Sequence, residues 1–177
     1  MAYTYDAEQW LPFPVELVFA FFSNPENLPR LMPGWQKARI EEASFAPPPA
    51  HPNPSGKMKG IAAGVGTRLT MSFRPFPLSP IRLPWEAEIT EFEWDDHFCD
   101  IQVRGPFAYW KHCHRLTAET RSGVAGALLK DHVEYELPGG GIAGLAQPFV
   151  AFQLASTFKY RQSRTAELMP LMAASSR

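Results

Sequence analysis

Apolar and polar residues alternate along most of the chain before residue 138, and a period of two is typical of β-strands that bury one face. Short turn signals, such as Gly105-Pro106 and Ser122-Gly123, separate the later segments, so consecutive strands should pair as hairpins. The pattern predicts an antiparallel sheet of about six to seven strands, at residues 3–11, 35–45, 66–73, 81–94, 97–104, 107–120 and 124–137.

Three segments follow the helical period instead. Apolar positions in residues 14–23 recur at spacings of three and four, which predicts a short buried helix, and residues 26–32 predict a second one. After Pro138 the chain predicts one long helix, with Phe149 and Phe152 on its apolar face. A hairpin-connected sheet closed by a terminal helix is an α+β fold, with a curved antiparallel sheet around a long C-terminal helix.

Length and composition indicate a single globular domain over residues 1–177, because 45% of the residues are hydrophobic and 20% are charged. Prolines crowd residues 46–56, and proline lacks the donor that a sheet requires. Residues 46–64 are therefore a Pro-rich loop, which is either an exposed insertion or a lid over a site.

Charge and targeting signals exclude several partners. The net charge is -1 and the basic residues are scattered, so nucleic acid is not expected. No apolar run is long enough for an integral membrane segment, and the N-terminus lacks a secretory signal. Cys99 and Cys113 make no disulfide framework and fit a reducing, cytoplasmic location. The sequence leaves the oligomeric state open, and a homodimer is compatible with it.

The strand after Gly105-Pro106 carries the candidate chemistry. Side chains two residues apart share a face, so His112 and His114 point the same way as Trp110 and Leu116. Because those two neighbours are large and apolar, we expect both histidines to face the interior.

The turn at Gly105-Pro106 sets the expected pairing of two strands. If these two residues alone form the turn, Cys99 lies opposite His112, and Asp100 lies opposite Lys111. The second pair would place opposite charges together on the outer face, where an ion pair contributes little stability.

The same register turns Phe98 outward and places His97 opposite His114. Across the following hairpin, Asp131 lies roughly opposite His114 and shares its inward orientation. A β-bulge would flip part of this arrangement. The interior is thus expected to hold His97, Cys99, His112, His114 and Asp131.

Three interpretations of these polar residues stay open. They are core residues that satisfy one another by hydrogen bonds. Alternatively, His114 oriented by Asp131 is a general acid or base while His112 polarises a carbonyl oxygen. In the third interpretation Cys99 and the histidines, with His97 or Asp131, bind zinc or iron. The third has the weakest signature, and we expect no metal and no cofactor.

The order of elements and several motifs resemble the helix-grip fold of the START/Bet v 1-like superfamily, in the bacterial branch called SRPBCC or polyketide cyclase/dehydrase-like proteins. The motifs are FAFFSNPENL at residues 19–28, PGW at 33–35, FCDIQVRGPF at 98–107 and DHVEYELP at 131–138. The resemblance covers nearly the whole chain, and the Pro-rich loop departs from the usual pattern.

This resemblance implies a cavity between the sheet and the terminal helix that binds a small hydrophobic or aromatic ligand, such as a lipid, quinone or polyketide. Some members are cyclases or dehydratases, so a cyclase/dehydratase that uses His112, His114 and Asp131 is the alternative function. Fold alone does not decide between them. The expected ligand-binding residues are Phe22, Met71, Phe73, Trp85, Ile89, Cys99, Trp110, Tyr135, Phe149 and Phe152.

Overall fold

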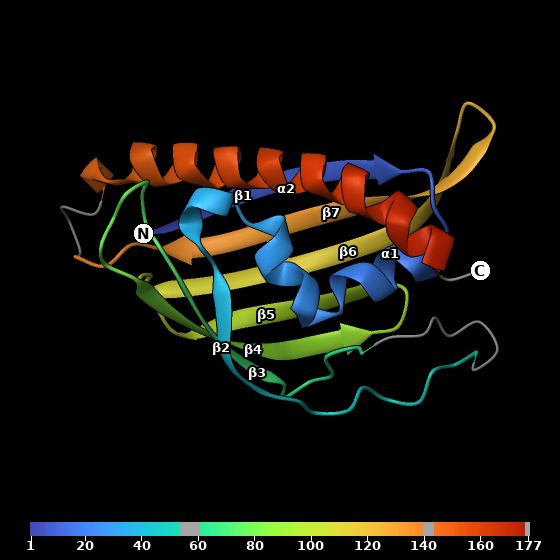
Figure 1. Ribbon diagram of the computed structural model, residues 1–177, viewed down its shortest axis with the longest axis horizontal. Helices are drawn as coiled ribbons and strands as arrows, with labels where there is room; N and C mark the ends of the chain where they lie inside the picture. The colour runs from blue at the N-terminus through green and yellow to red at the C-terminus, as the bar shows by residue number, and fades with distance from the viewer. Residues whose placement is uncertain (54–60, 140–143, 176–177) are drawn as a thin grey trace.

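The computed structural model describes residues 1–53, 61–139 and 144–175. Its centre is one seven-stranded antiparallel sheet in the order β1-β7-β6-β5-β4-β3-β2, which confirms the predicted architecture (Figure 1). The strands are β1 (Ala2–Leu11), β2 (Arg39–Ser44), β3 (Arg68–Phe73), β4 (Leu83–Glu93), β5 (His97–Arg104), β6 (Tyr109–Arg121) and β7 (Val124–Glu136).

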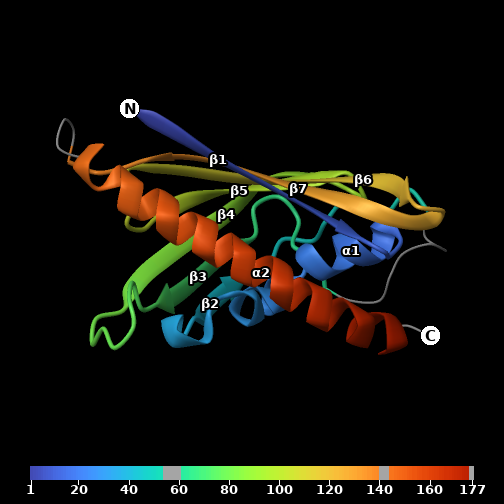
Figure 2. The same cartoon turned by 90° about the horizontal axis from the view of Figure 1, so that it is seen from above.

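Four helical segments accompany the sheet: α1 (Val15–Phe22), the 3-10 turns η1 (Pro25–Leu31) and η2 (Gly34–Gln36), and α2 (Gln147–Ser175). Helix α2 runs obliquely across the concave side of the sheet, and α1 lies between its C-terminal half and the sheet (Figure 2). Pro148 stands in the first turn of α2, where its missing N–H leaves no intrahelical hydrogen bond unmade.

The first predicted helix agrees with the structure, and the strand predicted from residue 35 starts later. Residues Gly34–Gln36 form a 3-10 turn, and Lys37 follows in the left-handed conformation with φ of 48°. That backbone geometry is incompatible with an extended strand. Strand β2 therefore begins at Arg39.

The hairpin between β6 and β7 follows the prediction. Ser122 and Gly123 have φ of 49° and 78°, as a tight hairpin turn with two left-handed residues requires. This turn sets the register, in which His112 pairs with Val133 and His114 pairs with Asp131, as expected.

The predicted pairing of β5 with β6 is wrong by one residue. Cys99 pairs with Cys113 and Asp100 pairs with His112, because the connection is longer than Gly105-Pro106. The side chain of Gln102 fills this longer loop: its amide donates to the Phe107 carbonyl at 2.8 Å and accepts from the Phe107 N–H at 3.3 Å.

A shift of one residue exchanges the two faces of a strand. Phe98 is buried in the core and Asp100 faces the interior, whereas both were predicted outside. His97, predicted inside, contacts Asp96 and Glu93 instead. Lys111 pairs with Glu91 at 2.6 Å and not with Asp100.

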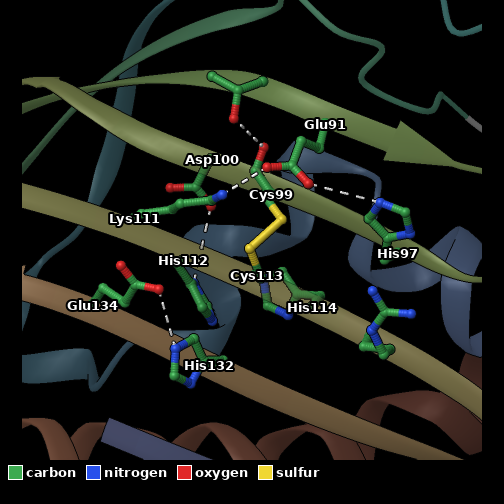
Figure 3. The surroundings of a disulfide bond; sticks show 12 residues. Glu91, His97, Cys99, Asp100, Lys111, His112, Cys113, His114, His132 and Glu134 are labelled. Carbon is green, nitrogen blue, oxygen red and sulfur yellow. Dashed lines mark hydrogen bonds and ion pairs between the residues drawn. A yellow bond between two sulfur atoms is a disulfide. The ribbon is translucent and has the colours of Figure 1, made fainter. Parts of the chain in front are cut away.

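The two cysteines form a disulfide, contrary to the sequence-based expectation. Cys99 and Cys113 lie directly opposite each other on β5 and β6, with their Cα atoms 4.1 Å apart. Figure 3 shows this bridge joining the two strands beside Asp100, His112 and His114. The cysteines therefore no longer argue for a reducing compartment.

Candidate functional site

A cavity of about 390 Å³ lies between the sheet, α2 and the short helices. Strands β3 to β6 provide one wall, and Phe158 and its neighbours on α2 provide the other. Several of the predicted ligand-binding and catalytic residues line this cavity, namely Phe22, Met71, Phe73, Trp85, Ile89, Trp110, His112, His114 and Phe149.

The other predicted site residues lie elsewhere. Tyr135 and Asp131 are buried outside the cavity lining, with Tyr135 in van der Waals contact with Trp110. Cys99 is held in the disulfide. Phe152 is 69% exposed on the outer side of α2, so the predicted apolar face of this helix is wrong at that residue.

The aromatic wall is built by contacts between strands. Trp85 on β4 meets Trp110 on β6 edge to face, with ring centroids 5.0 Å apart, and Phe107 packs against both. Such pairs stabilise the wall beyond their area burial. The cavity therefore keeps a pre-formed apolar surface on the sheet side.

One carboxylate anchors both interior histidines. His112 donates through Nε2 to Asp131 Oδ1 at 3.0 Å. His114 Nδ1 lies 2.6 Å from the same oxygen, in a contact that is short but poorly aligned for a hydrogen bond. Asp131 thus fixes the orientation of both imidazole rings. The ring nitrogen that does not contact Asp131 lies on the opposite edge of each ring.

Two charged residues stand on the other side of these rings. His112 Nδ1 is 3.9 Å from Asp100 Oδ1, and His114 Nε2 is 3.5 Å from Arg161 Nη2. Because Nε2 of His112 is held by Asp131, its Nδ1 is the ring nitrogen on the side of Asp100. Asp100, His112, His114 and Arg161 all line the cavity, where they form a polar cluster in a mainly apolar wall.

Sequence reasoning missed Asp100 and Arg161 as cavity residues. Asp100 was predicted on the outer face because the predicted register of β5 was wrong by one residue. Arg161 was not among the predicted site residues, although Phe158, Thr165 and Leu168, at spacings of three, four and seven from it, are all buried. That helical spacing was the available signal.

Burial determines the protonation of this cluster. It lowers the pKa of the His114 imidazole to about 3, and the neighbouring His112 acts in the same direction, so His114 is neutral near pH 7. Burial raises the pKa of the Asp100 carboxyl, and Asp131 adds to this rise against the opposing effects of His112 and Arg161. Burial would also raise the pKa of Asp131, but its contacts with His114 and His112 hold it below the usual range.

The metal ligand set expected from the sequence is not brought together. Cys99 is in the disulfide and His97 is on the outer face. Asp100, His112 and His114 do offer ligand atoms within 4.8 Å of one another. However, the guanidinium of Arg161 beside His114 opposes a divalent cation there.

The described parts of the Pro-rich loop are residues 46–53 and 61–64, and Ala63 in the second part lines the cavity. Trp94 donates from Nε1 to the Pro49 carbonyl at 2.8 Å, and His51 Nε2 is 3.3 Å from Asp95 Oδ2. Residues 46–53 are thereby held against the turn between β4 and β5. Residues 54–60, also part of the predicted loop, lie outside the described residues.

Fold and site together define a helix-grip protein, in which a curved sheet and a long C-terminal helix enclose an apolar cavity with one polar cluster. Residues 11–161 match the family described as polyketide cyclase / dehydrase and lipid transport. The chain belongs to this family, as the sequence resemblance indicated.

Solved structures show the same fold at low sequence identity. A protein from Chromobacterium violaceum superposes with a TM-score of 0.63 at 16% identity, covering 94% of this chain and 96% of that one. Norcoclaurine synthase from Thalictrum flavum has a TM-score of 0.60 at 15% identity, covering 95% and 86%. A Thermus thermophilus protein has a TM-score of 0.58 at 16% identity, covering 98% and 99%.

The search of curated proteins found no match to this chain. Among the described residues, none of the helices combines the length and the hydropathy that a bilayer span requires.

Proposed function

We propose that this protein binds one small hydrophobic or aromatic ligand in the cavity, with a polar group of the ligand directed at Asp100 and His112. The observation that carries the proposal is the cavity of about 390 Å³, whose mainly apolar wall holds one cluster of ionisable residues. Ligand sites typically combine such a wall with a few placed polar groups.

The polar cluster favours a ligand with an oxygen at one end. The 3.9 Å between His112 Nδ1 and Asp100 Oδ1 is too long for a direct hydrogen bond, and a hydroxyl placed between these atoms would contact both. Arg161 also lines the cavity, so its guanidinium brings further hydrogen-bond donors to this wall.

Titration with an aromatic probe tests the proposal. Hydroxybenzaldehyde is suitable, because norcoclaurine synthase from Thalictrum flavum, which shares this fold, has been solved in complex with dopamine and hydroxybenzaldehyde. Binding should quench the fluorescence of Trp85 and Trp110, both in the cavity wall. Ala87→Phe places a ring in the cavity and should abolish this quenching.

Ala125→Phe is the matched control, because Ala125 is exposed on β7. The control should bind as the native protein does. Equal binding by Ala87→Phe and the native protein would place the ligand elsewhere and contradict the proposal. Lipids and quinones can then be screened for competition with hydroxybenzaldehyde, which would define the ligand class.

A second candidate function, a cyclase or dehydratase, is favoured by the arrangement of His112 and Asp100 at the site. His112 is oriented by Asp131 through Nε2 and has its Nδ1 3.9 Å from Asp100 Oδ1, and burial raises the pKa of Asp100. His112 would take a proton from a carbon beside a ligand carbonyl, and Asp100 would protonate the carbonyl oxygen. An enol results, and the imidazolium and the Asp100 carboxylate retain overall charge balance.

His112→Gln separates the two functions. If the protein is such an enzyme, this change should abolish turnover of a carbonyl ligand while the binding constant changes little. The corresponding change His114→Gln should reduce turnover less, because Arg161 stands against the free edge of His114. Exchange of the acidic C–H for deuterium, followed by NMR, measures the first step directly. Exchange that survives in His112→Gln would rule out this role.

A further inference from the structure

One end of the molecule collects most of the exposed large apolar side chains of the described residues. Strands β1, β4 and β6 begin there, β3, β5 and β7 end there, and α2 starts there (Figures 1 and 2). The exposed apolar residues at this end are Met1, Phe76, Leu78, Ile81, Val103, Tyr109, Leu145, Phe149 and Phe152.

The cavity opens at the same end. Phe149 lines the cavity and is also 61% exposed, so it stands at the mouth. Pro75, on the loop between β3 and β4, lines the cavity from the opposite side, and its carbonyl accepts a hydrogen bond from Gln153 at 3.5 Å. We call the exposed apolar residues of these two flanking segments the apolar rim, namely Phe76, Leu78, Ile81, Leu145, Phe149 and Phe152.

The helical half of the apolar rim lies at the start of α2. Phe149 and Phe152 are three residues apart in the first turns of this helix, and Leu145 just precedes it. Leu145 is 86% exposed. Large apolar side chains of this kind are normally packed against another element, and here Phe152 and Leu145 are exposed.

Packing within the fold also does not explain the apolar residues in the loop half of the apolar rim. Leu78 is 92% exposed and has φ of 64°, a conformation that is costly for a leucine. Its exposed side chain offsets none of that cost in the folded protein. Contiguous exposed apolar residues of this kind mark interaction surfaces.

Basic side chains predominate in the segments that flank the mouth. Residues 74–85 and 101–110 contain no Asp or Glu, and they include Arg74, Arg82 and Arg104. Glu136 at the end of β7 is paired with the N-terminal ammonium at 3.9 Å. An apolar surface with a basic surrounding is complementary to an anionic lipid bilayer.

We propose that the apolar rim docks on the surface of an anionic lipid bilayer, so that the cavity mouth faces the membrane. The rim side chains then enter the boundary between headgroups and acyl chains, and the arginines contact lipid phosphates. The purpose of docking rests on the proposed function, since a lipophilic ligand would pass from the bilayer into the cavity. Docking itself requires no ligand.

Cosedimentation with vesicles tests the docking. The protein, without added ligand, should bind vesicles of phosphatidylcholine with roughly one third phosphatidylglycerol more tightly than vesicles of phosphatidylcholine alone, and added salt should weaken the difference. The variant Leu78→Ser, Leu145→Ser should bind about tenfold or more weakly. Both side chains lie outside the cavity lining, so hydroxybenzaldehyde binding should be unchanged.

The variant Leu171→Ser, Val124→Ser is the matched control. Leu171 is 65% exposed at the far end of α2, and Val124 is exposed at the opposite end of the sheet. Vesicle binding by this control variant should equal that of the native protein. No native binding, or an equal loss in both variants, overturns the docking without touching the ligand proposal. A native dimer that Leu78→Ser, Leu145→Ser converts to a monomer would assign the rim to a second copy and also overturn it.

Discussion

The burial of His114 makes stability depend on pH in a calculable way. In the unfolded chain an imidazole binds a proton near its ordinary pKa of 6.5, whereas in the fold the pKa is about 3. Between these values the unfolded state holds the extra proton, so the free energy of unfolding falls as pH falls. Lowering the pH from 7 to 5 should cost about 2 kcal/mol through this residue alone.

Other groups act in the opposite direction in the same range. The raised pKa values of Asp100, through burial, and of His132, through its hydrogen bond with Asp6, let the folded protein bind protons first, which stabilises it as pH falls. The comparison that isolates His114 is therefore between native protein and His114→Gln, whose side chain does not titrate.

Urea unfolding at several pH values between 7 and 5 measures this difference. The native free energy of unfolding should fall by about 2 kcal/mol more than that of His114→Gln over this range. If His114→Gln does not fold, NMR titration of the native imidazole gives the same information, since its signals should not shift above about pH 4. Parallel pH profiles for the two proteins, or a midpoint near 6.5, would refute the reasoning.

Two further predictions test the corrected strand pairing. Phe98→Ala should destabilise the protein by about 3–5 kcal/mol in urea unfolding, and Val103→Ala by less than about 0.5 kcal/mol, because Phe98 is buried and Val103 is exposed; comparable values would mean that β5 faces the other way. Reduction of the Cys99–Cys113 disulfide should lower the free energy of unfolding by about 3 kcal/mol, since it opens a loop with a sequence separation of 14, and identical curves with and without reductant would show that the bridge does not form.

The general architecture could be predicted from the sequence because it depends on local patterns. Alternation of apolar and polar residues located the strands, and turn residues such as Ser122-Gly123 gave the correct register for β6 and β7. A short turn there placed Asp131 roughly opposite His114, and the structure pairs these two residues directly. The anchoring carboxylate was thus within reach of sequence reasoning.

The remainder of the site depended on contacts between distant residues. The loop after Arg104 contains a side-chain bridge from Gln102, and its length decided which face of β5 turns inward. This one-residue shift turns the Asp100 side chain toward the cavity. It turns Cys99 to the opposite face of the sheet, where Cys99 forms the disulfide with Cys113. The alternation in residues 97–104 favours the wrong register, because Cys99, Ile101 and Val103 make the outward face more apolar than the face that carries Asp100 and Gln102.

The α+β class, the strands and the inward orientation of His112 and His114 could be read from the chain alone, because they follow from backbone periodicity. In contrast, the contact of Arg161 with His114, the place of Phe149 at the mouth and the exposure of Phe152 became known only from the folded protein. These features depend on how α2 rotates and crosses the sheet, and that geometry is set by packing between residues far apart in the chain.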